Sequence, residues 1–288
     1  MTPAAAALGI GTATFLANYG LPSEGSDPAE ARLVPRDDLL RAALSGGVRY
    51  LDTAADYGDG ELEVGRVLAD GVRVCTKIAP GGSIDLVRAS VERLGAAPDT
   101  ILIHSAVREH MRSAPAIDAL REARACGLAR RIGVSTYGIE DAAFGLAQPW
   151  VDVVQIEYSI LNQSTLRATE YARSDQEVVV RSVLCKGLLT SRRTAAPRLA
   201  AQVQDALDGI EQCAREWDHS VEALAIRFAL DTPGIDIVLV GVSSRAELGT
   251  ALSAAAAPRL THEQWHRLAA FDRRDADAAH PERWALLS

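Results

Sequence analysis

Four side chains that can transfer or hold protons follow three short apolar runs of the chain. Asp52 ends the first run, Tyr57 stands five residues later, Lys77 follows the second run, and His104 ends the third. A tyrosine hydroxyl, with an ordinary pKa of about 10, gives up its proton readily only where positive charge stabilises the phenolate. Lys77 can supply that charge, Asp52 can hold the ammonium in place, and His104 can donate a hydrogen bond to an oxygen that becomes negative. The set predicts a site for proton transfer at oxygen.

The elements that must position these residues alternate between short apolar runs and helical patterns. Eight runs predict strands, at 8–11, 49–52, 73–76, 100–104, 131–135, 153–157, 178–182 and 237–240. Most are continuously hydrophobic, which is typical of a parallel sheet covered on both faces. Helical spacing separates them at 35–46, 61–69, 83–95, 116–127, 139–147, 164–173, 199–217 with 221–230, and 244–256. Eight such units favour a closed (β/α)₈ TIM barrel over an open doubly wound sheet.

No change of composition divides the chain, so residues 1–288 are predicted to be a single domain with its core at 8–256. The part at 258–288 breaks the rhythm and is expected to hold one extra helix at 261–271 and a polar tail. Active sites of such barrels lie at the carboxyl ends of the strands. Six predicted strand ends carry polar side chains there: Asp52, Lys77, His104, Ser135, Glu157 and Ser182.

Composition excludes several classes of protein. The 288 residues carry a formal net charge of −8, which argues against a nucleic-acid partner held on a basic face. The sequence has neither an apolar run long enough for a membrane span nor a basic signal-peptide region at its start, so we expect a cytoplasmic protein that does not enter membranes. The four cysteines form no C-x-x-C pair, which predicts free thiols in a reducing compartment and no metal site.

Six motifs at successive strand ends resemble the aldo-keto reductase family, in particular bacterial members that begin directly with a barrel strand. The longest is Asp52-Thr53-Ala54, then Tyr57-Gly58, Glu61 and Gly65, in which Gly60 replaces the usual Ser and Val64 the usual Leu. The others lie at 74–77, 101–104, 132–135, 155–162 and 182–189, so the resemblance covers residues 8–256.

This resemblance implies reduction of an aldehyde or ketone, or oxidation of the alcohol, with a nicotinamide cofactor. Tyr57 would be the general acid or base, and Lys77, Asp52 and His104 would complete a tetrad. Aromatic residues make up only 5% of the chain, which favours a polar, sugar-like small molecule over a polycyclic one. The candidates for an apolar lining are Phe15, Tyr19 and Trp284.

The resemblance also implies which residues bind the cofactor. Ser135 and Gln155 would bind the carboxamide and Arg181 would stack on the nicotinamide ring. Three residues would line the pyrophosphate and three would face the ribose and adenine: Ser182, Leu184 and Gly187, then Gly241, Ser243 and Glu247. NADPH is favoured because it is the usual cofactor of the family. NADH stays as the alternative, because Ser243 stands where many members carry a basic residue. The nearest basic candidate for a 2′-phosphate is Arg245.

Other interpretations stay open or are disfavoured. The barrel could bind the cofactor as a redox-sensing or regulatory subunit with little turnover, or it could isomerise a sugar. The basic loop at 190–200 either covers the pyrophosphate or is simply solvated. Gly9-Ile10-Gly11 lacks the third glycine of a Rossmann fingerprint, since Thr14 occupies its place, and no tyrosine has the Lys four residues later that a short-chain dehydrogenase needs. His262 and His266 fit the H-E-x-x-H pattern of zinc proteases, but Thr261 and Gln264 predict a helix-capping box instead.

Overall fold

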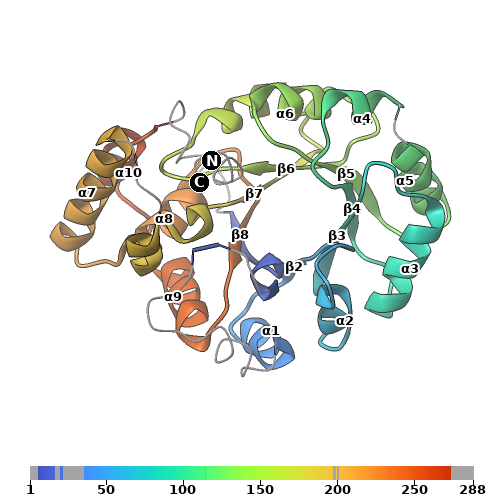
Figure 1. Cartoon of the computed structure of the whole chain (residues 1–288), viewed down its shortest axis with the longest axis horizontal. Coiled ribbons are helices and arrows are strands. Elements are labelled where there is room, and N and C mark those ends of the chain that lie inside the picture. Colours follow the sequence, from blue (N-terminus) through green and yellow to red (C-terminus); the bar gives the residue numbers. More distant parts are fainter. Residues whose placement is uncertain are drawn as a thin grey trace.

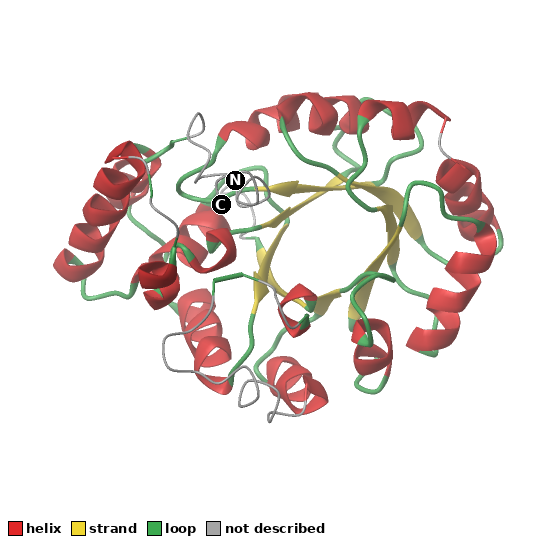
Figure 2. Cartoon of the chain, viewed as in Figure 1, coloured by secondary structure: helices red, strands yellow, loops and turns green. Residues whose placement is uncertain are grey.

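Eight parallel strands close into a barrel in the computed structural model, which describes residues 6–16, 20, 21, 36–113, 115–196, 199 and 201–273. The strands are β1 (Ala7–Gly11), β2 (Tyr50–Asp52), β3 (Arg73–Ile78), β4 (Thr100–Ile103), β5 (Arg131–Ser135), β6 (Val153–Glu157), β7 (Glu177–Arg181) and β8 (Ile237–Gly241). Each strand pairs with the next along the chain, and β8 pairs with β1. Figures 1 and 2 show the strands as an inner ring with the helices outside it. The predicted TIM barrel is confirmed.

The outer helices cover apolar strand faces, as the helical spacings predict. They are α1 (Arg36–Ser45), α2 (Gly60–Gly65), α3 (Ile84–Leu94), α4 (Arg108–Ser113), α5 (Pro115–Ala125), α6 (Ile139–Leu146), α7 (Ala201–Glu216), α8 (Val221–Asp231), α9 (Arg245–Ala256) and α10 (His262–Ala269). Short 3₁₀ turns lie at η1 (Ala13–Phe15), η3 (Ser164–Tyr171), η4 (Cys185–Gly187) and η5 (Ser191–Ala195).

Two segments differ from the prediction. The α-helix expected at 164–173 is the 3₁₀ helix η3, in which the hydroxyls of Thr165 and Thr169 bond to Glu157 and to the Leu166 carbonyl. Such side-chain bonds compete with regular helical hydrogen bonding. The short helix α4 forms where a loop was expected, and the His110 ring accepts a hydrogen bond from the Val107 amide just before it.

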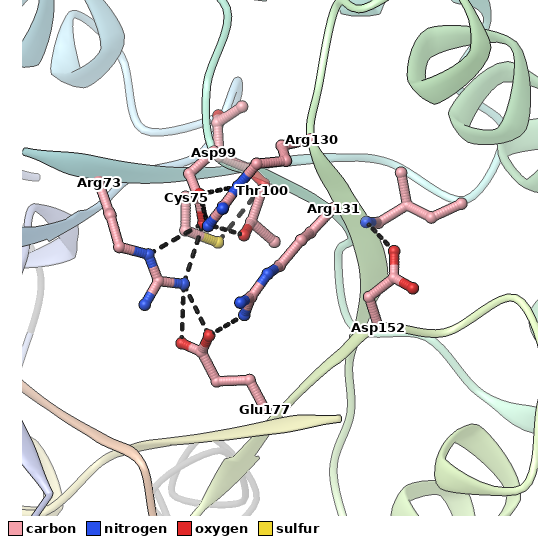
Figure 3. A network of polar contacts seen from close by, with 10 residues as sticks. Arg73, Cys75, Asp99, Thr100, Arg130, Arg131, Asp152 and Glu177 are labelled. Carbon is pink, nitrogen blue, oxygen red and sulfur yellow. Dashed lines mark hydrogen bonds and ion pairs between the residues drawn. The ribbon is translucent and has the colours of Figure 1, made fainter. Parts of the chain in front are cut away.

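A network of ion pairs lies at the amino ends of the strands, opposite the predicted active site. Arg73 on β3 contacts Glu177 on β7 at 2.6 Å and Asp99, just before β4, at 2.9 Å (Figure 3). Arg131 on β5 also bonds to Glu177, and Arg130 lies 2.6 Å from Asp99. The network therefore links strands from opposite sides of the barrel.

Above this network the barrel interior is apolar. One cluster of buried side chains fills it, drawn from six of the strands: Tyr50, Cys75, Leu102, Val153, Val179, Ile237 and Leu239. Gly133 on β5 leaves no room for a side chain, because a Cβ there would lie 1.8 Å from the Val153 carbonyl oxygen. Strands β5 and β6 can therefore approach each other closely, below the polar part of the barrel interior that begins at Asp52.

The last described helix, α10, packs against α8. Its capping box is confirmed, with Thr261 accepting from the Gln264 amide and Gln264 reaching back to the Thr261 amide. Trp265 stacks on Phe228 of α8, with ring centroids 5.2 Å apart. The predicted polar tail lies outside the described residues.

Several smaller predictions have mixed outcomes. All four cysteines are free, and three are buried. Phe15 is 5% exposed and belongs to the main cluster of buried apolar side chains, so its role in lining a substrate pocket stays a prediction. Tyr19, Trp284 and most of the polar loop at 21–34 lie outside the described residues. Among the described helices, none is both long and apolar enough to cross a membrane.

Candidate active site

A buried ion pair joins the ends of two neighbouring strands. The Lys77 Nζ atom lies 2.6 Å from Asp52 Oδ2 and donates a second hydrogen bond to the Thr53 carbonyl at 2.8 Å. The Lys77 side chain is 1% exposed and that of Asp52 is 7% exposed. Burial is the largest single effect and disfavours the ammonium, but the charge and hydrogen bond of Asp52, together with the nearby Tyr57 and Cys75, raise the pKa of Lys77 above its ordinary range. The two side chains form a fixed ion pair that is buried away from the protein surface.

Tyr57 lies beside this pair, on the turn after β2. The Lys77 ammonium is 5.3 Å from the centroid of the Tyr57 ring. Burial raises the pKa of Tyr57, and the nearby Lys77 charge lowers it by less, so the net shift is upward. Desolvation therefore outweighs the stabilisation of the phenolate that the sequence predicts, and the hydroxyl keeps its proton at neutral pH until a neighbouring oxygen takes it.

The turn that carries Tyr57 explains one departure from the family motif. A Cβ on Gly60 would lie 2.8 Å from Thr53 Oγ1 and 3.2 Å from Thr12 Oγ1. Those two hydroxyls are hydrogen-bonded to each other at 2.9 Å and are fully buried. A serine at position 60 would therefore displace this contact, whereas glycine leaves it intact.

His104 completes the group just beyond the end of β4. Its ring meets that of Tyr57 edge-on, with centroids 5.6 Å apart. Its Nδ1 atom lies 3.0 Å from Asp56 Oδ2, and this hydrogen bond lowers the pKa of Asp56. An ionised carboxylate can only accept, so Nδ1 carries the hydrogen. The four predicted catalytic residues thus lie together, with Asp56 as a fifth member that the sequence argument missed.

A chain of hydrogen bonds continues from Asp52 across the barrel. Gln155 on β6 donates to Asp52 Oδ1 at 2.8 Å, and its Oε1 accepts from the Ser135 hydroxyl at 3.2 Å. Gln155 is fully buried and Ser135 is 1% exposed. The two residues expected to bind a carboxamide therefore also orient Asp52 from the side opposite Lys77.

A cavity of about 410 Å³ lies between the carboxyl ends of β7 and β8. Five of the predicted cofactor residues line it: Ser182, Leu184, Gly187, Gly241 and Glu247. Phosphate sites of TIM barrels commonly lie at the loops after these two strands. The predicted tetrad does not line this cavity. The Arg181 guanidinium donates to the Ser182 hydroxyl at 3.3 Å and so connects the two regions.

The loop after β7 is held in an unusual backbone conformation. Ser182, Cys185 and Lys186 have left-handed φ angles of 63°, 46° and 52°. Non-glycine residues pay about 1–3 kcal/mol for such conformations, which cluster at ligand-binding sites. The same loop supplies hydroxyl and cationic groups to the cavity wall: Ser182, Lys186, Thr190, Ser191 and Arg192. This donor set suits a phosphate-bearing ligand.

Arg192 occupies the adenosine end expected for the cofactor. It bonds to the Ser243 hydroxyl at 2.9 Å and forms an ion pair with Glu247. Ser243 in turn donates to Glu247 through its amide at 2.6 Å and its hydroxyl at 2.9 Å. Arg245, the basic residue chosen from sequence, is exposed and does not line the cavity. The basic loop is therefore not simply solvated at Arg192.

Arg181 stands apart from the cavity wall, at the end of β7. Its guanidinium lies 4.0 Å from the centroid of the Tyr137 ring and donates to the Thr136 carbonyl at 2.7 Å. These contacts keep the planar group flat against an aromatic face. Its charge lowers the pKa of Tyr57 in opposition to burial, so the two residues are electrostatically linked.

Known proteins resemble this chain over the whole barrel. The model of the Aldo/keto reductase family matches residues 7–273. An aldo-keto reductase of Mycolicibacterium vanbaalenii is 34% identical over 223 residues, which cover 70% of this chain and 78% of that protein. The D-arabinose 1-dehydrogenase of Saccharomyces cerevisiae is 25% identical over 265 residues, covering 77% of each. Matches to other mycobacterial aldo-keto reductases span 62% of the length of those relatives.

Solved structures share the barrel. A Bombyx mori aldo-keto reductase in complex with NADP superimposes with a TM-score of 0.67 at 21% identity, covering 93% of this chain and 90% of that one. At this identity the likeness concerns the fold. The family match from β1 to beyond α10, together with the Mycolicibacterium relative, shows that this chain belongs to the aldo/keto reductase family of NAD(P)H-dependent oxidoreductases.

Proposed function

We propose that this chain reduces an aldehyde or ketone of a polar, sugar-like small molecule, or oxidises the alcohol, with Tyr57 as general acid or base. The observation that carries the proposal is the buried pair of Lys77 and Asp52 beside the Tyr57 ring. Family membership supports the reaction class. When bound, a nicotinamide dinucleotide supplies or accepts the hydride.

The residues of the chain have separate tasks in carbonyl reduction. Tyr57 stays protonated at neutral pH, because burial raises its pKa, and it gives its proton to the substrate oxygen as negative charge develops there. The Lys77 ammonium then stabilises the phenolate that remains. Asp56 holds Nδ1 of His104 by a hydrogen bond, which leaves Nε2 as the ring atom that can hydrogen-bond to the same oxygen. In alcohol oxidation each step reverses.

The cavity between β7 and β8 is the proposed cofactor site. Its cationic and hydroxyl donors fit a pyrophosphate, and Ser182, Leu184, Gly187, Gly241 and Glu247 are already at its wall. We assign NADPH as the preferred cofactor, since Arg192 can exchange its partner Glu247 for a 2′-phosphate. The Bombyx mori neighbour solved with NADP supports this choice.

A polar substrate agrees with the groups around the tetrad. The exposed and half-buried side chains there are Asp56, His104, Arg181 and Tyr137, all of which can hydrogen-bond to hydroxyl groups. A steroid-sized apolar molecule would remove water from these groups and offer no hydrogen bonds in return, which is costly. The yeast relative named for D-arabinose supports the same substrate class.

The test is titration of the purified protein with NADPH and, separately, NADH, followed by quenching of tryptophan fluorescence. We expect the parent to bind one nucleotide tightly and to reduce polar aldehydes. Tyr57→Phe should lose most turnover and keep its affinity for the cofactor. Binding without turnover in the parent would favour the regulatory interpretation. Binding of neither nucleotide by the folded protein would refute the cofactor assignment.

A further inference from the structure

Two histidines on helix α10 face each other on the protein surface. The Nε2 atoms of His262 and His266 lie 2.9 Å apart, and their ring centroids are 4.1 Å apart. Residues four apart stand on the same face of a helix. Both rings are exposed, and neither belongs to the catalytic site or the cofactor cavity. At this distance one nitrogen donates its hydrogen to the lone pair of the other.

This spacing fits one class of metal ion. Imidazole nitrogens bind divalent transition metals at about 2.0–2.1 Å. Two nitrogens 2.9 Å apart then subtend roughly 90° at the metal, whereas the tetrahedral angle of zinc needs a separation of roughly 3.3–3.4 Å. A right angle between neighbouring ligands is the geometry of octahedral or square-planar Ni²⁺ and Cu²⁺.

We propose that His262 and His266 form a two-nitrogen surface site for Ni²⁺ or Cu²⁺, in which the hydrogen between the two Nε2 atoms moves to Nδ1 of its own ring and both Nε2 lone pairs bind the metal. Water would complete the coordination, because no cluster of three or more metal-ligating side chains occurs in the described part of the chain. The H-E-x-x-H pattern then marks an exchangeable metal clamp on an outer helix, and not a protease zinc centre.

Neighbouring residues hold the two rings in place before a metal arrives. The capping box of Thr261 and Gln264 fixes the first turn of α10. Trp265 turns to the other side, where its indole nitrogen bonds to Thr232 Oγ1 at 3.2 Å. The His266 ring packs edge-on against the Trp265 indole, with centroids 5.1 Å apart. A paramagnetic ion held by the two histidines would therefore lie close enough to quench the fluorescence of Trp265.

The test is calorimetric titration of the untagged full chain with NiCl₂ and with ZnCl₂, with tryptophan fluorescence recorded in parallel. We expect one Ni²⁺ per chain, bound more tightly than Zn²⁺, and loss of at least about tenfold in Ni²⁺ affinity in His262→Gln and in His266→Gln. His219→Gln, which removes an exposed histidine elsewhere, should bind Ni²⁺ like the parent.

A second variant separates the clamp from the mere presence of two histidines. His266→Arg combined with Arg267→His keeps the composition and charge but places the rings about 140° apart around the helix. This variant should lose the Ni²⁺ site and the quenching while circular dichroism and nucleotide binding stay unchanged. Equal Ni²⁺ binding by this variant, or Zn²⁺ binding as tight as Ni²⁺ in the parent, would overturn the proposal.

Discussion

Asp56 Oδ2 lies 3.0 Å from Nδ1 of His104, so the carboxylate selects which nitrogen of the imidazole is left for the substrate. The hydrogen bond from His104 holds the pKa of Asp56 below its ordinary range, and Asp56 therefore remains an acceptor at neutral pH. The contact fixes the orientation of the ring and leaves Nε2 as the nitrogen that can hydrogen-bond to the substrate oxygen.

Replacing Asp56 by Asn should lower turnover. We expect kcat for carbonyl reduction to fall about two- to fivefold, because a neutral amide is a weaker acceptor for the Nδ1 hydrogen of His104 and an exposed contact contributes modestly. Steady-state kinetics of carbonyl reduction measure the change. Asp59→Asn, in the same turn, is the control; an unchanged kcat in Asp56→Asn would count against this role.

Lys77→Met should destabilise the whole domain. Removing the ammonium leaves Asp52 buried without its counterion, which costs about 3–5 kcal/mol. Urea unfolding measures the change, and adding Asp52→Asn should recover part of it by removing the uncompensated charge. Because the pKa of Lys77 is raised, its contribution is complete below the ordinary lysine pKa and fades only as pH rises through the higher folded-state value. The free energy of unfolding should therefore fall by the same amount at about pH 6 and about pH 8, which both lie below the ordinary lysine pKa. A decrease at only one of these pH values would contradict the ion-pair explanation.

Arg192→Gln should change the choice of nucleotide. If Arg192 binds the 2′-phosphate, its loss weakens NADPH about tenfold or more and leaves NADH nearly unaffected. Fluorescence titration of both nucleotides gives the ratio. Arg193→Gln is a matched control from the same loop, since Arg193 pairs with Glu211 at 2.8 Å, away from the cavity wall. An equal loss for both nucleotides in Arg192→Gln would place the guanidinium elsewhere on the cofactor.

Arg73→Leu should weaken the amino end of the barrel without changing the active site. Glu177 and Asp99 each lose one of their two arginine partners, at a cost of about 1–3 kcal/mol. Burial raises the pKa of Asp99, but the hydrogen bond from Arg73 helps to hold it below its ordinary value. The stabilisation by this ion pair is therefore complete above the ordinary Asp pKa and is lost as pH falls through the lowered value. Thermal unfolding should therefore show a smaller difference from the parent in strong acid than at neutral pH. An unchanged difference at both would reject the electrostatic account.

The strands were predictable from sequence because each is a largely buried apolar run, and six of the eight predicted runs end at or just before a polar residue. Arg131–Ser135 and Val153–Glu157 match their predicted bounds, and the other strands differ by a residue or two at an end. The alternation with helices then determined the barrel, since parallel neighbours need crossovers. Asp52, Lys77 and His104 could be placed together because parallel strands end at the same edge.

Contacts between loops could not be predicted in the same way. The charges on Arg192 and Glu247 are visible in the sequence, but nothing in their spacing says that the loop after β7 crosses to the start of α9. Asp56 looks like an ordinary turn residue until the end of β4 brings His104 within 3.0 Å of it. The Arg73 and Glu177 pair is hidden for the same reason, because the two residues meet across the barrel interior.

The pairing of β1 with β8 has a consequence for how the protein is made. Ala7 pairs with Ile237, so nearly the whole chain must leave the ribosome before β1 meets its second neighbour. Earlier strands can pair with each other during synthesis, but the growing sheet keeps two open edges throughout. Pairing over such sequence distances is slow, and unpaired edges invite association between nascent chains. The emergence of β8 from the ribosome therefore sets the earliest moment at which the barrel can close.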